Sequence, residues 1–305
     1  MVTPILPAGA LVALATPTGT DGGPDLESLD RLVDHVLAGR VAGISPCGST
    51  GEGARMTSKE RLAVTARVIE RAGELPVIAG VPVSALPDAE AELGQLQELG
   101  ARAALVAPPA YFPMPAKEVE AYYRRLADSS PLPLVLYNIP AFTRVPLPAQ
   151  TVGSLATHEN VVGLKDSSRD LEYLQSVMLA RGDAGDFRVY TGTDTMLVAS
   201  SLAGADGSIA ASANLVPELG VRILSLVHSD LPAALELQRQ LGEIVAACRK
   251  GTPPAGWKAA LSLLGLCSRA PFAPAMPLDE EEIPQMRDAL LSARVAQSTG
   301  IGVRR

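Results

Sequence analysis

The amino-acid sequence predicts an α/β fold, namely a (β/α)8 TIM barrel followed by a C-terminal helical extension. Short apolar runs of strand length alternate with longer stretches whose apolar residues recur at helical spacing. This alternation is typical of parallel sheets, in which consecutive strands are joined by helical crossovers. Eight such units within roughly 220 residues match a TIM barrel. A doubly wound sheet would carry a glycine-rich dinucleotide turn after its first strand, and residues 16–19 (TPTG) lack that pattern.

The expected elements follow one another at regular intervals along the chain. At the first helix, Asp25 is a suitable N-cap, because its carboxylate can accept a hydrogen bond from a free backbone N–H of the first turn. The barrel is expected to span residues 1–228. Its strands are expected at residues 10–16, 41–46, 76–81, 103–107, 134–138, 161–166, 188–191 and 207–211. Its helices are expected at residues 26–37, 58–71, 85–99, 116–126, 170–181 and 217–227.

The alternation ends after residue 228, and the rest of the chain has a purely helical pattern. Helices are expected at residues 231–249, 256–264 and 280–295, separated by proline-rich turns. These helices are few and rich in alanine, so they cannot form a large core of their own. We therefore expect residues 229–305 to be an extension that packs on the barrel or on a neighbouring subunit.

The charge, the cysteines and the N-terminal residues indicate which kind of partner and which cell compartment to expect. The net charge is −7 and the isoelectric point is about 5.1, which argues against a nucleic acid or a membrane surface as partner and favours a small-molecule substrate. The three cysteines have no metal-ligand spacing and no disulfide pattern, so no metal is expected. The N-terminus has no basic region, and its prolines are unlike a signal peptide. We expect a cytoplasmic protein.

Lys165 lies within residues 161–167 (VVGLKDS), a run that otherwise has the composition of a buried strand. A lysine there loses hydration, which disfavours the ammonium form and favours a neutral, nucleophilic amine. Such an amine can form a Schiff base with a carbonyl substrate. The structural alternative is a lysine at a strand end that extends its amine to solvent. Only five of the 26 basic residues are lysines, and the other four lie in polar or helical segments: Lys59, Lys117, Lys250 and Lys258.

Two further strand ends carry polar groups, and in a TIM barrel these ends meet at the active face. Tyr137 ends the strand before that of Lys165, where a phenol can shuttle protons during Schiff-base chemistry. The alternative is a tyrosine that only makes a structural hydrogen bond. The second strand is followed by residues 47–53 (CGSTGEG), whose backbone N–H groups and hydroxyls can receive a carboxylate. Phosphate is also possible there, although the spacing is not that of a Walker loop.

Together these segments resemble the dihydrodipicolinate synthase / N-acetylneuraminate lyase family of pyruvate-dependent class I aldolases, which are lyases. The resemblance is carried by residues 48–52 (GSTGE), 137–140 (YNIP) and 163–167 (GLKDS). It extends in the same order over about residues 8–295, with the motifs nearest to members that act as 2-keto-3-deoxy sugar acid aldolases. Further matching segments are residues 79–81, 108–112 and 204–209.

The resemblance implies a TIM barrel in which Lys165 forms an imine with pyruvate or another 2-keto acid. Tyr137 would be the proton shuttle, and Ser49 and Thr50 would bind the keto-acid carboxylate, with Thr50 also in the proton relay. The imine makes a metal or organic cofactor unnecessary in this family.

The resemblance also implies roles for more distant groups. The backbone carbonyl near Ile209 would face the pyruvyl group, and Tyr111 matches a tyrosine that completes the relay in a neighbouring subunit. Because the loop around Tyr111 is altered, that role is left open. The family is commonly a homotetramer, built as a dimer of dimers.

Residues in the loops that follow the strands indicate which second substrate joins pyruvate. Phe142 stands where dihydrodipicolinate synthases typically carry an arginine that binds aspartate semialdehyde, and Arg144 could replace it only with a rearranged loop. Thr195 and Ala211 stand where sialic acid lyases carry polar ligands, which disfavours a nine-carbon sugar acid. The favoured activity is therefore cleavage or formation of a short 2-keto-3-deoxy acid from pyruvate and an aldehyde.

The sequence leaves open the residues that bind the aldehyde half and two alternative activities. Phe142 would contact the aldehyde half, and Thr143 and Asp194 could bind its hydroxyls, although a turn threonine and a helix cap explain the last two equally well. The first alternative activity is 4-hydroxy-tetrahydrodipicolinate synthase, which condenses pyruvate with aspartate semialdehyde. The second alternative is a keto-acid-binding regulatory protein without turnover.

Overall fold

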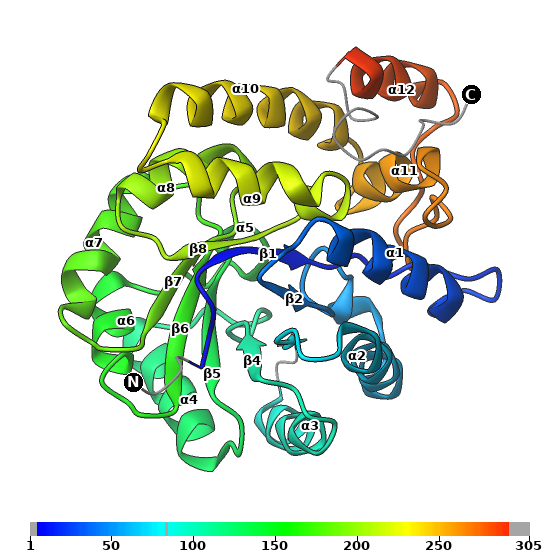
Figure 1. Cartoon of the computed structure of the whole chain (residues 1–305). Helices are drawn as coiled ribbons and strands as arrows, with labels where there is room; N and C mark the ends of the chain where they lie inside the picture. The colour runs from blue at the N-terminus through cyan, green and yellow to red at the C-terminus, as the bar shows by residue number, and fades with distance from the viewer. Residues whose placement is uncertain (1–4, 83–84, 293–305) are drawn as a thin grey trace.

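Eight parallel strands form a barrel at the centre of the structure, a computed structural model that describes residues 5–82 and 85–292 (Figure 1). Their order in the sheet is β2-β1-β8-β7-β6-β5-β4-β3. The two end strands approach each other through a parallel bridge between Ile44 and Val77, where the N–H of Ile44 donates to the carbonyl of Pro76 over 3.0 Å. The TIM-barrel prediction is confirmed. The strands are β1 (Gly9–Ala13), β2 (Gly43–Ser45), β3 (Ile78–Val81), β4 (Ala103–Val106), β5 (Leu134–Asn138), β6 (Val161–Asp166), β7 (Arg188–Thr191) and β8 (Gly207–Ala210).

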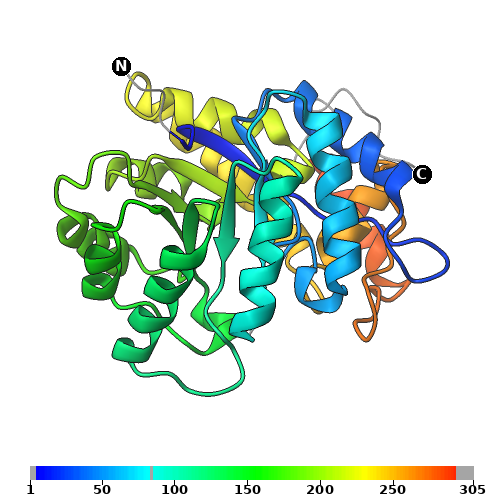
Figure 2. The same cartoon turned by 90° about the horizontal axis from the view of Figure 1, so that it is seen from below.

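Apolar residues on both faces of each strand explain the barrel. Side chains such as Leu11, Ile78 and Val135 fill the interior, while the other face of each strand packs under the helices. Figure 2 shows the same arrangement from below, with the helices on the outside of the strands. The strands are therefore buried on both sides, which is why they appear in the sequence as continuous apolar runs.

The expected helices are present, with ends that shift by a few residues. Asp25 caps the first helix, since its carboxylate accepts a hydrogen bond from the N–H of Ser28 over 3.0 Å. Three short helices, α5, α6 and α8, were not predicted, because seven residues or fewer leave too little helical periodicity to recognise. The helices of the barrel are α1 (Leu26–Ala38), α2 (Ser58–Ala72), α3 (Leu86–Glu98), α4 (Ala116–Ser129), α5 (Pro140–Thr143), α6 (Ala149–Leu155), α7 (Leu171–Arg181), α8 (Leu197–Leu202) and α9 (Pro217–Leu226).

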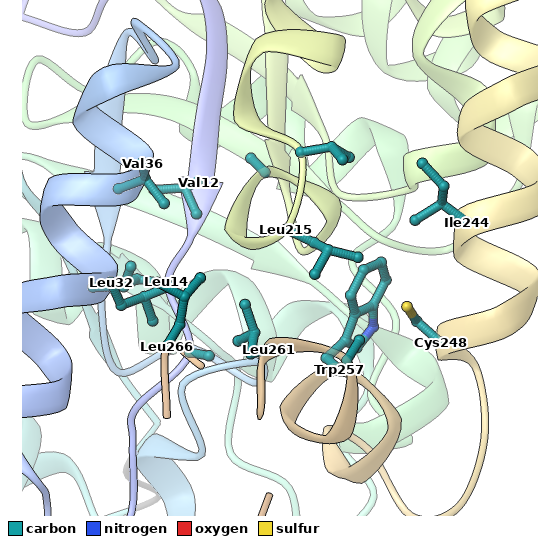
Figure 3. Packing of buried hydrophobic residues seen from close by; sticks show 14 of the residues in the cluster. Val12, Leu14, Leu32, Val36, Leu215, Ile244, Cys248, Trp257, Leu261 and Leu266 are labelled. Atoms are coloured by element: carbon teal, nitrogen blue, oxygen red, sulfur yellow. The ribbon is translucent and has the colours of Figure 1, made fainter. Parts of the chain in front are cut away.

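The C-terminal extension packs directly on the barrel. Helices α10 (Leu231–Cys248), α11 (Ala255–Leu263) and α12 (Glu282–Ser292) follow α9, and the expected end of the last helix at residue 295 lies outside the described residues. Figure 3 shows that Trp257 of α11 and Cys248 of α10 share one apolar cluster with Leu32 of α1. The extension and the barrel therefore share a core. None of the helices in the described ranges is both long and apolar enough to cross a membrane.

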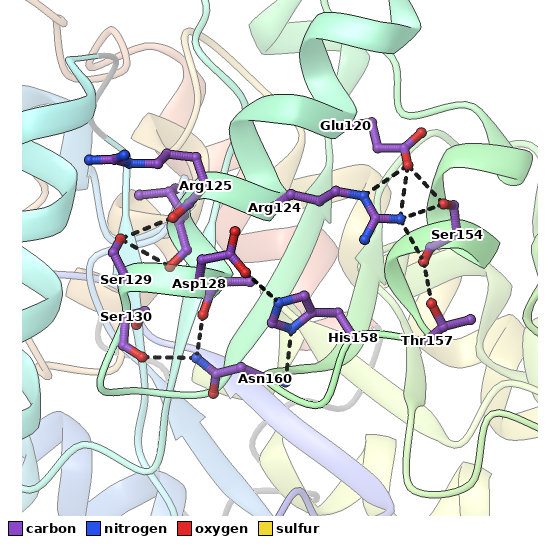
Figure 4. A network of polar contacts seen from close by, with 12 residues as sticks. Glu120, Arg124, Arg125, Asp128, Ser129, Ser130, Ser154, Thr157, His158 and Asn160 are labelled. Atoms are coloured by element: carbon purple, nitrogen blue, oxygen red, sulfur yellow. Dashed lines mark hydrogen bonds and ion pairs between the residues drawn. The ribbon is translucent and has the colours of Figure 1, made fainter.

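A polar network outside the barrel holds the connection that leads into β6, the strand of Lys165 (Figure 4). The side-chain amide of Asn160 donates to the carbonyls of Ala127 and Ser130, over 3.0 and 2.9 Å. Its backbone N–H donates to the ring of His158, which also lies 3.1 Å from Asp128. These bonds tie the end of α4 to the start of β6.

Replacing Asn160 by alanine is expected to lower the free energy of unfolding by about 1–3 kcal/mol, because two carbonyls at the end of α4 lose their partner. Urea denaturation would measure the change. Thr157→Ala is a control, since its exposed hydroxyl makes one bond to a nearby carbonyl. Equal small losses for both variants would contradict the role given to Asn160.

Candidate active site

Lys165 lies near the carboxyl end of β6 and is only 3% exposed. In the sheet it pairs with Tyr137 of β5 on one side and with Tyr190 of β7 on the other. The amine Nζ lies 4.5 Å from the centre of the Tyr137 ring. Gly192 gives this side chain room, because a Cβ at that position would come within 2.9 Å of Lys165 Cε and 2.0 Å of Ser167 Oγ. The lysine is therefore held in the barrel rather than extended into solvent.

The loop after β2 brings Ser49 and Thr50 to the same place. The hydroxyl of Ser49 lies 3.3 Å from the phenol oxygen of Tyr137, and either group can donate. The hydroxyl of Thr16 donates to the carbonyl of Gly51 over 2.7 Å, which fixes the turn. Ser49, Thr50 and Tyr137 line a cavity of about 540 Å³ together with Lys165 and Ile209. Five of the residues chosen from the sequence are thus brought together.

A buried ion pair anchors this loop to the extension. The carboxylate of Glu52, 3% exposed, accepts hydrogen bonds from Lys258 over 2.7 Å, from Arg55 over 2.7 Å and from the N–H of Phe272 over 3.0 Å. Lys258 also donates to the hydroxyl of Thr18. Loss of hydration lowers the pKa of the Lys258 amine, and the charge of Glu52 opposes that shift.

Lys258 corrects one interpretation of the sequence. It was grouped with the lysines of polar or helical segments, and it is on a helix, but its side chain is fully buried. Two features of the sequence could have indicated its burial: the mostly apolar helix around it and an acidic residue in the loop of residues 48–52 that could pair with it. The extension also supplies one wall of the cavity, which the sequence did not indicate. That wall comprises residues 248–251, 253, 254, 256 and 257.

The residues expected near the aldehyde half are only partly brought together. Asp194 lines the cavity, and one of its oxygens accepts a hydrogen bond from the N–H of Ser212 over 2.7 Å. Phe142, 54% exposed, lines it as well. The hydroxyl of Thr143, in contrast, is bonded to the carbonyls of Ile139 and Val145, both at 3.1 Å, and Thr143 does not line this cavity.

Tyr111 lies apart from the other site residues. Its side chain is 86% exposed and packs edge-on against Phe112, with ring centres 4.9 Å apart. A second, more apolar cavity of about 390 Å³ adjoins the first and shares Ser49, Tyr137 and Phe142 with it. Arg144 is exposed and lines neither cavity.

The chain is similar to known proteins over nearly its whole length. Residues 6–293 match the model of the Dihydrodipicolinate synthetase family. The 4-hydroxy-tetrahydrodipicolinate synthase of Pelobacter propionicus is 35% identical over 272 residues, which cover 87% of this chain and 92% of the relative. That of Xanthomonas campestris is 35% identical over 261 residues, covering 85% of this chain and 86% of the relative.

Solved structures of similar proteins have the same fold. The dihydrodipicolinate synthase of Thermotoga maritima superposes with a TM-score of 0.91 at 28% identity, covering 95% of this chain and 99% of the other. A prophage protein of the dihydrodipicolinic acid synthase family from E. coli K12, solved in complex with pyruvate, gives 0.90 at 28% identity, with 94% and 99% covered.

Proposed function

The chain belongs to the dihydrodipicolinate synthetase family of pyruvate-dependent aldolases, as the sequence motifs indicated, and we propose that it cleaves or forms a short 2-keto-3-deoxy acid. The aldol partners would be pyruvate and an aldehyde. The observation that carries the proposal is a buried lysine amine beside a tyrosine ring in a cavity whose loop presents two hydroxyls. Family membership makes the chain a lyase and leaves the regulatory alternative without support.

The first half of the proposed reaction uses Lys165. Its neutral amine attacks the keto carbon of pyruvate, and the carbinolamine loses water to form an imine. Tyr137 delivers the proton that the leaving water needs, and the hydroxyl of Ser49, 3.3 Å away, continues the relay towards Thr50. Ser49 and Thr50 bind the pyruvate carboxylate, and the carbonyl of Ile209 faces the pyruvyl group.

The second half joins or separates the aldehyde. Loss of a proton from the pyruvyl methyl group gives an enamine, which attacks the aldehyde carbon to form a carbon–carbon bond. Hydrolysis of the resulting imine releases the product and restores the Lys165 amine. The imine serves as the electron sink, so the proposed reaction needs neither a metal nor an organic cofactor. Cleavage follows the same steps in reverse.

Tyr111 is proposed to act in the site of a neighbouring subunit within a homotetramer. Its exposed ring and that of Phe112 form an apolar surface of the kind that an interface covers. The apolar cavity beside Ser49 and Tyr137 offers space for an aromatic ring from a second copy.

The loop after β5 bears on which of the two proposed substrates the enzyme uses. Phe142 offers no charge to a carboxylate, and Arg144 lines neither cavity, so the loop after β5 lacks the arginine expected to bind aspartate semialdehyde in a dihydrodipicolinate synthase. This supports a 2-keto-3-deoxy acid. The second candidate function is 4-hydroxy-tetrahydrodipicolinate synthase, favoured by the activity named for the relatives at 35% identity.

Borohydride reduction in the presence of labelled pyruvate is expected to add one pyruvyl group to the peptide that contains Lys165. Lys165→Met should abolish the label, whereas Lys117→Met, at an exposed lysine of α4, should leave it unchanged. Peptide mapping by mass spectrometry makes the measurement. No adduct, or an adduct at another lysine, would overturn the proposal. Turnover of a panel of 2-keto-3-deoxy acids and of aspartate semialdehyde would then separate the two activities.

A further inference from the structure

The mouth of the active-site cavity carries an excess of positive charge. Arg169, Arg249 and Lys250 line it, against a single carboxylate, that of Asp194. One Asp194 oxygen is already bonded to the N–H of Ser212. Within residues 5–82 and 85–292, no ion pair or hydrogen bond is found for the side chains of the three cationic residues. The imine chemistry assigned to Lys165 uses none of them.

Arg169 occupies its place at a conformational cost. Its φ is 65°, in the left-handed region that a residue with a Cβ rarely adopts and that glycine adopts freely. It directly follows the segment of residues 163–168 that carries Lys165, so this backbone turn sets the guanidinium at the cavity mouth. Glycine would relieve this backbone, and the chain carries an arginine there instead.

Arg249 comes to the same mouth from the end of α10. Partial loss of hydration lowers the pKa of its guanidinium, the like charge of Arg169 lowers it further, and Asp194 acts in the opposite direction. Two guanidiniums that repel each other across a cavity are stabilised by an anion bound between them. Their planar donors suit the paired oxygens of a carboxylate or a phosphate.

We propose that Arg169 and Arg249, with Lys250, bind an anionic group at the far end of the aldehyde half of the substrate. The inference rests on the proposed function, because it assumes that pyruvate occupies the part of the cavity next to Lys165. The substrate is then a 2-keto acid with a second anion, a carboxylate or a phosphate, at its other end. The extension and the turn after β6 then supply the positive charge that Phe142 of the same cavity does not offer.

The test compares aldehydes that have the same number of carbon atoms and differ in charge. Glyceraldehyde is compared with glyceraldehyde 3-phosphate, and butyraldehyde with succinic semialdehyde, each condensed with pyruvate. The wild-type enzyme should prefer the anionic member of at least one pair by about tenfold or more in kcat/KM. The pair that shows the preference distinguishes phosphate from carboxylate. Arg169→Gln and Arg249→Gln should each remove most of that preference by raising KM, and leave the neutral aldehydes within about twofold.

Two further variants separate binding from folding. Arg169→Gly relieves the left-handed backbone, so it should keep or raise Tm and still lose the preference for the anion. Arg40→Gln is the matched control, since Arg40 is exposed, has a φ of 58° and lies before β2, at the opposite end of the barrel. Arg40→Gln should change neither Tm nor the preference for the anionic aldehyde.

The outcomes distinguish the two proposals. A borohydride adduct at Lys165 combined with equal kcat/KM for charged and neutral aldehydes would overturn the anion site and leave the aldolase standing. An anion preference that survives both glutamine substitutions would overturn the assignment to these arginines. Failure to form any pyruvate adduct would overturn both.

Discussion

Replacing Tyr137 by phenylalanine is expected to lower kcat by about 10²–10⁴-fold, the usual contribution of a positioned proton-transfer group. Tyr137 is 5% exposed, and its ring lies beside Lys165, where the carbinolamine must gain and lose protons. The ring itself remains in the variant, so its packing against the lysine is kept. Steady-state kinetics and the rate of borohydride trapping would locate the loss in imine formation.

Tyr190 provides the matched control for that experiment. It pairs with Lys165 from β7, the neighbouring strand opposite to that of Tyr137, and is fully buried, but it does not line the cavity. Its phenol donates to the carbonyl of Pro7, so Tyr190→Phe should cost about 1–3 kcal/mol of stability and leave kcat nearly unchanged. Equal losses of kcat in the two variants would contradict the role of Tyr137.

The sequence predicted the barrel and its reactive strand ends well. The expected strands at residues 134–138, 161–166 and 188–191 coincide with β5, β6 and β7, because parallel strands covered on both faces are unbroken apolar runs. Once their order is known, Tyr137 and Lys165 must be neighbours. Local composition and topology together are sufficient for this part of the site.

Other parts depend on contacts between distant segments. Lys258 and Glu52 are 206 positions apart, and no local pattern pairs them. Nothing in the sequence marks Arg169, because a charged residue after a strand is typical of a surface turn, and its left-handed backbone is visible only in the structure. Thr143 was considered for substrate hydroxyls, although its own backbone turn uses its hydroxyl.

Replacing Lys258 by methionine is expected to lower the free energy of unfolding by about 3 kcal/mol, near the lower end of what losing one partner of a buried ion pair costs. Methionine keeps much of the volume of the lysine stem, so the loss comes from a buried Glu52 carboxylate without its counter-charge. Arg55 and the N–H of Phe272 still contact that carboxylate, which moderates the loss. Because Glu52 ends the loop of Ser49 and Thr50, KM for pyruvate should also rise.

A double-mutant cycle tests whether the charge pair itself is responsible. Glu52→Gln/Lys258→Met removes both charges, so it should be more stable than the sum of the two single losses by about 1 kcal/mol or more. Lys117→Met, at an exposed lysine, should stay within about 0.5 kcal/mol of the wild type. Urea denaturation of the wild type, the two single variants, the double variant and Lys117→Met gives the five free energies of unfolding. Additive losses would mean that Lys258 stabilises the fold through its packing, and that its charge does not hold Glu52.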